Sequence, residues 1–83
     1  MRFRLTQAAK KYLDSQDKET VRRVYDALRR MTKTPPEGDI IPLTDKENTY
    51  RARIGQFRII FKKQDNIAYV TDIGPRGQIY KQI

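Results

Sequence analysis

Apolar and polar residues are distributed along the first third of the chain in two distinct patterns. Met1, Phe3 and Leu5 stand at every second position of residues 1–5, a period that predicts a short strand. From Lys18 to about Thr32 the apolar residues recur every three or four positions, which is the spacing of one helix face. The members of this face are Val21, Val24, Tyr25, Leu28 and Met31. The chain is therefore predicted to begin as a strand and to continue into an amphipathic helix.

A shorter helix is predicted between these two elements. Thr6 has the side-chain oxygen that caps a helix N-terminus, and the helix that follows runs to about Leu13. Residues 14–17, Asp-Ser-Gln-Asp, then supply a turn and the cap of the longer helix. Pro35 and Pro36 follow that helix, and proline both lacks the backbone donor and clashes with the preceding turn. Two helices joined by so short a turn form an antiparallel hairpin.

The C-terminal half is predicted to form a sheet. Three runs, Tyr50–Ile54, Phe57–Lys63 and Ile67–Ile73, are rich in β-branched and aromatic residues and are separated by short turn segments. Connections this short join antiparallel neighbours. We therefore predict one α+β domain over residues 1–83. It comprises an N-terminal strand, an αα-hairpin and an antiparallel meander of three to four strands, with the helices packed on one sheet face.

The Gly55-Gln56 segment predicts the register of the first hairpin in this sheet. If it is a two-residue loop, Ile54 pairs with Phe57 and alternate side chains of both strands point to the same face. That face is apolar and is expected to lie under the helices; its other members are Tyr50, Ala52, Ile59 and Phe61.

The opposite face of the same hairpin is predicted to be strongly basic. The register places Arg53 directly opposite Arg58, with Arg51 and Lys62 further along. Like charges directly opposite one another destabilise a sheet, and residues 48–63 contain no acid that could offset them, Glu47 being the nearest to that segment. We interpret this face as a surface for a bound anion, the alternative being a solvated surface of long, flexible cations.

The end of the chain adds a second cationic feature. A Gly-Pro and an Arg-Gly pair indicate an exposed turn that presents Arg76, with Tyr80 and Lys81 close behind it. Tyr69 and Thr71 alternate onto the basic face if the third strand pairs without a slip in register. Cations interleaved with aromatic rings suit single-stranded RNA, because arginines contact phosphates and rings stack on unpaired bases.

Composition limits the classes of partner and of chemistry. With 18 Lys and Arg against 10 Asp and Glu, the net charge of +8 favours polyanionic partners. Cys and His are absent, so thiolate and imidazole metal ligands are excluded, as is the commonest neutral-pH general base. The acids at 14/17, 37/39 and 45/47 are interpreted as turn and cap residues far from the basic face, so we expect no metal and no cofactor. The chain shows neither a membrane-spanning apolar run nor a signal peptide, and we expect a cytoplasmic protein without a membrane partner.

Cleavage of RNA through its own 2′-hydroxyl is a reaction that these residues can support. It needs a base for the hydroxyl, charge stabilisation at the phosphorane, an acid for the leaving 5′-oxygen and in-line positioning. Arginine supplies the charge stabilisation but is a poor base because it is always protonated. Tyr80, with a pKa lowered by neighbouring cations, or Lys81 is the candidate for proton transfer.

Two segments carry a resemblance to a known family. Residues 50–61, Tyr-Arg-Ala-Arg-Ile-Gly-Gln-Phe-Arg-Ile-Ile-Phe, resemble the YRxRxGxYRxxY core of the RelE/ParE toxin superfamily, and residues 72–81 resemble its closing xxGxRxxxY segment. The resemblance covers essentially the whole chain. It implies a toxin of a type II toxin–antitoxin system, and in its RelE branch a ribosome-dependent, metal-independent endoribonuclease that cuts mRNA at the A-site codon. The implied partners are a cognate antitoxin, mRNA and the ribosome with its rRNA.

The resemblance also implies roles for individual residues. Arg51 and Arg53 correspond to the family's basic pair, where RelE itself has lysine, and Arg58 to its third-strand arginine. Arg58 and Arg76 would hold the scissile phosphate, and Tyr80 would stack on or activate the nucleotide. The predicted catalytic residues are Arg58, Arg76, Tyr80 and Lys81, and the predicted RNA- or ribosome-binding residues are Arg51, Arg53 and Lys62.

Two other functions are compatible with the same residues. The ParE branch of the superfamily shares the scaffold but inhibits DNA gyrase without cleaving RNA, and it would tolerate loss of Tyr80. A non-catalytic RNA- or ribosome-binding module would use the arginines only for phosphate contacts, with a steep salt dependence and no product. The joint presence of Arg58, Arg76 and Tyr80 favours the RelE branch.

Overall fold

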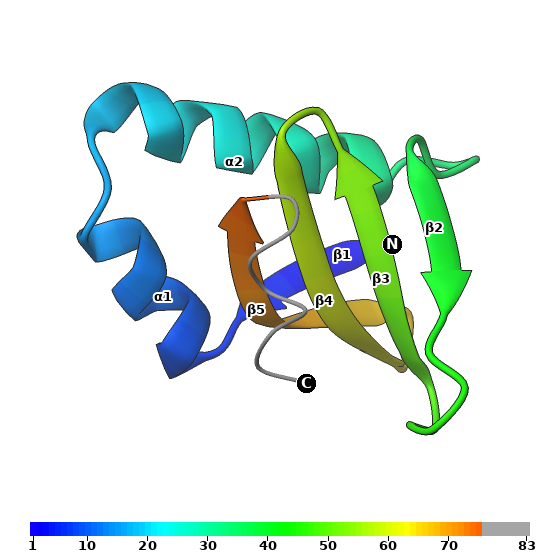
Figure 1. Ribbon diagram of the computed structural model, residues 1–83. Coiled ribbons are helices and arrows are strands. Elements are labelled where there is room, and N and C mark those ends of the chain that lie inside the picture. The colour runs from blue at the N-terminus through cyan, green and yellow to red at the C-terminus, as the bar shows by residue number, and fades with distance from the viewer. Residues whose placement is uncertain (76–83) are drawn as a thin grey trace.

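A mixed sheet backed by a helical hairpin forms the part of the chain that the computed structural model describes, residues 1–75. The elements are β1 (Arg2–Leu5), α1 (Gln7–Asp14), α2 (Lys18–Met31), β2 (Asp39–Pro42), β3 (Thr49–Ile54), β4 (Phe57–Gln64) and β5 (Ile67–Pro75). The strand order is β1-β5-β4-β3-β2; β1 runs parallel to β5 and the other neighbours are antiparallel. Both helices lie against one face of the sheet (Figure 1). The predicted α+β fold is confirmed.

The two helices begin at the predicted caps. The Thr6 hydroxyl oxygen accepts a hydrogen bond from the Ala9 N–H at 3.4 Å, and an Asp17 carboxylate oxygen accepts one from the Thr20 N–H at 2.8 Å. Each bond satisfies a backbone donor that has no partner within its own helix. The hydrogen bonds from Thr20 also hold the pKa of the Asp17 carboxyl below its ordinary value. Neither helix is long and apolar enough to span a membrane, as judged over residues 1–75.

The core lies between the helices and the inner face of the sheet. The alternating residues predicted to face the helices do so, and the Phe61 ring, 2% exposed, lies 5.4 Å from the Tyr50 ring in a stacked arrangement. The helices contribute Ala9, Leu13, Val24, Ala27, Leu28 and Met31; the strands contribute Ala52, Ile54, Ile59, Phe61, Ala68, Val70 and Ile73. Burying this apolar surface is the main stabilising contribution in a domain of this size.

Two tight hairpins set the register of the meander. Ile54 pairs with Phe57 across Gly55, whose φ of 60° lies in the left-handed region that glycine adopts without a steric penalty. Asp65 and Asn66 form the next loop, both with positive φ, as a two-residue loop of the mirror-image type requires. The predicted register of β3 against β4 is confirmed.

An edge strand, β2, completes the sheet beside β3. No strand was predicted at these residues. Pro42 suits an edge position because the missing N–H is not needed there. Before the strand, Gly38 has a φ of 107°, and a β-carbon at that position would lie 2.6 Å from Cγ1 of Ile54. Glycine is therefore needed both for the backbone conformation and for the close approach to β3.

A bulge in β5 changes which residues reach the outer face. Tyr69 lies on the outer face as predicted, beside Lys62, but the pairing shifts between Ile60 and Phe61, so that Asp72 rather than Thr71 stands beside Ile60. The Thr71 hydroxyl lies 3.4 Å from the Ile60 carbonyl oxygen. Beyond the bulge the alternation of β5 is shifted by one residue, so that Asp72 reaches the outer face.

Candidate nucleic-acid interface

The outer face of the sheet, opposite the helices, carries the described basic residues of the predicted site. Arg51 and Arg53 come from β3, and Arg58 and Lys62 from β4. Arg53 pairs directly with Arg58 in the sheet register, and Lys62 pairs with Thr49. The structure thus brings the four residues onto one face, as predicted. Arg76, Tyr80 and Lys81 lie outside the described residues.

Two of these arginines are held in the protein rather than extended into solvent. Arg51 is 8% exposed and Arg58 is 7% exposed, and the Nε atoms of both are buried. The alternative of solvated, flexible cations is therefore wrong for this pair. Burial removes much of the rotational freedom of a side chain, so the direction of each guanidinium is fixed before any ligand arrives. Arg53, one-third exposed, and the exposed Lys62 are the more accessible cations of the face.

An acidic residue, Asp39, lies beside the arginines of the outer face, which was not predicted. The Asp39 carboxylate lies 3.7 Å from a guanidinium nitrogen of Arg53. Asp39 was predicted to sit in a turn far from the basic face; it is instead the first residue of β2, directly opposite Arg53. The β-branched pair Ile40-Ile41 was the sequence signal for this strand. Since both side chains are partly solvated, the ion pair contributes at most about 1 kcal/mol, and a phosphate can compete for the guanidinium.

A second carboxylate lies on the other side of the arginines. Asp72 of β5 stands beside Ile60 because of the bulge, and it accepts a hydrogen bond from the Thr71 hydroxyl at 3.1 Å. The arginines of β3 and β4 are thus flanked by single acids on β2 and β5. Within residues 1–75, no three or more Asp and Glu side chains group together in a way that could hold a metal ion.

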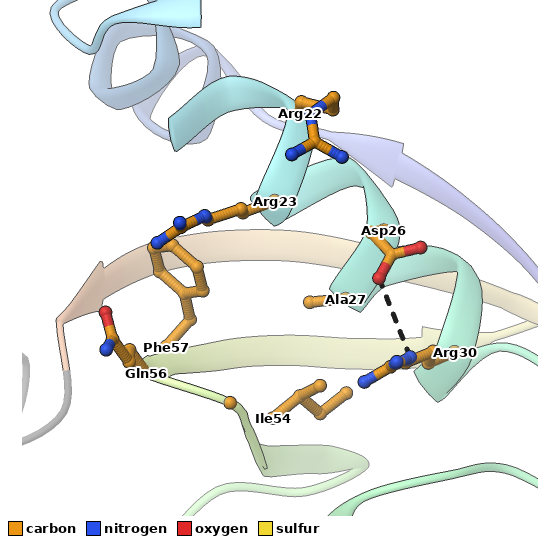
Figure 2. A pocket seen from close by; sticks show the side chains of 9 residues that line it. Arg22, Arg23, Asp26, Ala27, Arg30, Ile54, Gln56 and Phe57 are labelled. Carbon is orange, nitrogen blue, oxygen red and sulfur yellow. Dashed lines mark ion pairs between the residues drawn. The ribbon is translucent and has the colours of Figure 1, made fainter. Parts of the chain in front are cut away.

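A groove lies on the helix side of the sheet, where α2 passes the β3–β4 hairpin. It encloses about 270 Å³. Figure 2 shows Arg23 and Arg30 of α2 beside it, with Ile54 and Phe57 of the hairpin supplying apolar walls. Arg30 lies 3.6 Å from the carboxylate of Asp26. An apolar wall bordered by arginines suits an apolar side chain carried on an acidic segment.

A mixed sheet with a helical hairpin on one face is a fold that this chain shares with toxins of the RelE/ParE superfamily. The chain belongs to the ParE toxin family of the type II toxin–antitoxin system parDE, whose sequence model matches residues 3–80. It is accordingly a toxin of a type II toxin–antitoxin system. No curated protein sequence matches the chain.

Solved structures share this fold over nearly their whole length. The chain is similar to the toxin–antitoxin complex RelBE2 from Mycobacterium tuberculosis, with 20% identity and a TM-score of 0.73 over 90% of this chain and 96% of that one. It is also similar to the archaeal RelE–RelB complex from Pyrococcus horikoshii, with 26% identity and a TM-score of 0.68 over 93% and 96%. A third similar structure is the RelB–RelE complex from Methanococcus jannaschii, with 17% identity and a TM-score of 0.71 over 100% and 99%.

Proposed function

We propose that this toxin cleaves mRNA on the ribosome, within the codon in the A site, without a protein-bound metal or other cofactor. The observation that supports the proposal is the group of arginines on neighbouring strands, with Arg53 directly opposite Arg58 and with Arg51 and Arg58 buried. Like charges directly opposite one another repel, and an anion that binds across them reduces this repulsion. A phosphate in an RNA backbone is such an anion.

The proposed reaction uses the 2′-hydroxyl of the nucleotide that precedes the scissile bond. Its oxygen attacks phosphorus while the bond to the 5′-oxygen breaks, giving a 2′,3′-cyclic phosphate and a 5′-hydroxyl. The guanidiniums of Arg58 and Arg76 would stabilise the extra negative charge of the phosphorane by paired hydrogen bonds. Tyr80 or Lys81 would move the proton, because arginine is always protonated. The roles of Arg76 and Tyr80 come from the resemblance to the family motif, and that of Lys81 from its residue type.

The remaining cations suit the ribosome as the place of reaction. Arg51, Arg53 and Lys62 would contact phosphates of the mRNA or rRNA and fix the orientation of the toxin. Such contacts carry little sequence information, so the position of the cut is set by the ribosomal A site rather than by base recognition. A ribosomal target implies a cytoplasmic protein.

The test is cleavage of a defined mRNA on programmed ribosomes in magnesium buffer. We expect cuts confined to the A-site codon, and strong losses of rate in Arg58→Gln, Arg76→Ala and Tyr80→Phe. Arg23→Gln, which removes an exposed arginine of α2, is the charge-matched control and should cut at the native rate. A single 2′-deoxynucleotide before the scissile bond should abolish the cut. Intact mRNA with the native chain would refute the proposal.

Gyrase inhibition is the second candidate, and the match to a ParE family model is the observation that favours it. A supercoiling assay with purified gyrase separates the two functions. Inhibition of gyrase by a chain that leaves ribosome-bound mRNA intact would establish the ParE function. Under our proposal the native chain leaves supercoiling unaffected at concentrations that cleave mRNA.

We also propose an antitoxin as the partner that keeps this toxin inactive. The similar structures described above are toxin–antitoxin complexes, and the chain carries a net charge of +8. An acidic antitoxin would cover the basic face, and the groove beside α2 would hold one of its apolar side chains. The purified complex of the two proteins should leave mRNA intact in the ribosome assay.

A further inference from the structure

A tyrosine between two cations lies on the outer face, beside the strand that carries Arg58. Tyr69 of β5 pairs with Arg4 of β1 on one side and with Lys62 of β4 on the other. Arg4, Tyr69 and Lys62 each follow a residue that packs into the core. Because side chains alternate along a strand, all three point to the outer face. The neighbours that pack inward are Phe3, Leu5, Phe61, Ala68 and Val70. Arg4 was not among the predicted site residues, because the parallel pairing of β1 with β5 joins residues that are far apart in the chain.

This row is accessible to a ligand. Arg4 and Lys62 are exposed and Tyr69 is half-buried, whereas Arg51 and Arg58 are buried. Within residues 1–75, neither Arg4 nor Lys62 is paired with a carboxylate. Neighbouring strands are about 4.8 Å apart, so the two cations stand about 10 Å apart with the ring between them.

The row is also continuous with the proposed catalytic site. Lys62 is four residues from Arg58 along β4, which corresponds to about 13 Å at the rise of an extended strand. A single strand of RNA whose phosphate contacts Arg58 can therefore reach Tyr69 with a neighbouring nucleotide.

We propose that Arg4, Tyr69 and Lys62 form a stacking subsite for an unpaired nucleotide of RNA adjacent to the one that is cleaved. The Tyr69 ring would stack on the base, and the two cations would contact the phosphates on either side of it. Stacking tolerates any base, because every base has a π-face, so the subsite adds affinity without sequence preference. The inference rests on the proposed function, because it takes RNA as the substrate.

The test measures binding of a fluorescently labelled single-stranded RNA oligonucleotide to the full chain over a range of salt concentrations. The expected effect of Tyr69→Thr, which keeps a strand-forming residue but removes the ring, is a loss of affinity of about 5-fold or more. Tyr69→Phe keeps the ring and should bind as the native chain does. Arg4→Gln and Lys62→Gln should each reduce the slope of log affinity against log salt by about 0.7, whereas Tyr69→Thr should leave the slope unchanged.

A matched control and a second probe distinguish this subsite from a general effect of charge or folding. Lys10→Gln removes one exposed cation from α1 and should change affinity less than Lys62→Gln does. An oligonucleotide without bases, carrying only the sugar–phosphate backbone, should bind native and Tyr69→Thr chains equally.

The outcomes separate this inference from the nuclease proposal. If the native chain cleaves ribosome-bound mRNA but Tyr69→Thr binds RNA as tightly as the native chain does, the stacking subsite is refuted and the nuclease proposal stands. If the native chain neither cleaves mRNA nor binds the oligonucleotide, both are refuted. Ring-dependent binding together with cleavage supports both.

Discussion

The Asp39–Arg53 ion pair offers a direct test of the proposed RNA contact, because Asp39 would compete with phosphate for the same guanidinium. The two side chains are 3.7 Å apart and both are partly exposed. We expect Asp39→Asn, which keeps the shape of the side chain and removes its charge, to bind single-stranded RNA more tightly than the native chain does. The effect on folding should be small, since an exposed pair contributes roughly 0–1 kcal/mol.

The magnitude follows from Coulomb's law. A phosphate oxygen that contacts the other side of the Arg53 guanidinium would lie roughly 7 Å from the Asp39 carboxylate. Repulsion at that distance is ~0.6 kcal/mol at the dielectric constant of water and ~2.4 kcal/mol at an effective value of 20. Because Asp39 is exposed, the lower part of this range applies, which corresponds to about 3-fold to 10-fold tighter binding.

Fluorescence anisotropy with a labelled RNA oligonucleotide measures this gain. Asp14→Asn makes the same change of charge at an exposed position at the end of α1, on the helix side of the sheet, and is the matched control. The difference between the two variants should be largest at low salt and should shrink as the Debye length falls from about 30 Å at 0.01 M to about 3 Å at 1 M. Equal binding by Asp39→Asn and Asp14→Asn would show that RNA phosphate does not occupy Arg53, and the reasoning would fail.

Three further predictions concern stability and chemistry. Phe61→Ala should destabilise the fold by about 3–5 kcal/mol, since it removes a buried ring stacked on Tyr50, and urea denaturation would measure it. Arg58→Lys keeps the positive charge but loses the paired hydrogen bonds to phosphate. The rate of ribosome-dependent cleavage should therefore fall at least about 10-fold, while the salt dependence of RNA binding is unchanged. A native rate of cleavage would contradict the role given to Arg58. Asp17→Ala should destabilise the chain at pH 7, and the destabilisation should become smaller as the pH falls. The pKa of Asp17 is lower in the folded chain than in the unfolded chain, where it is near 3.8. The stability that this difference provides is present above the unfolded pKa and is lost as the pH drops through the folded pKa. Urea midpoints for both chains at pH 7 and pH 3 would check this, and a difference that persists unchanged at pH 3 would contradict it.

Local features of the sequence were sufficient to predict most of the fold. The caps at Thr6 and Asp17 involve residues only three positions apart, and the Gly55-Gln56 loop fixes the register of two strands by itself. Chemistry confined to one turn can be recognised in a sequence without knowledge of distant contacts. These elements, the helical hairpin and the opposition of Arg53 and Arg58 were therefore predicted correctly.

The errors all arose where contacts join distant parts of the chain. Asp39 approaches Arg53 only because β2 adds to the sheet edge, and a strand of four residues ending in proline has little pattern of its own. The bulge at Thr71 moves Asp72 onto the outer face, and nothing in the alternation of β5 indicates an extra residue. Arg4 joins Tyr69 through parallel pairing, for which no connecting turn gives a local signal.

The burial of Arg51 and Arg58 connects the architecture of this toxin with its proposed chemistry. A domain of 83 residues has a stability of roughly 4–12 kcal/mol, so the desolvation of two buried guanidiniums is large enough to require compensation elsewhere in the fold. The helical hairpin and the inner sheet face contribute the apolar core, to which the outer face adds Ile60, 3% exposed. Under the proposed function, the inner face of the sheet serves mainly stability, and the positive charges of the outer face would stabilise a phosphorane.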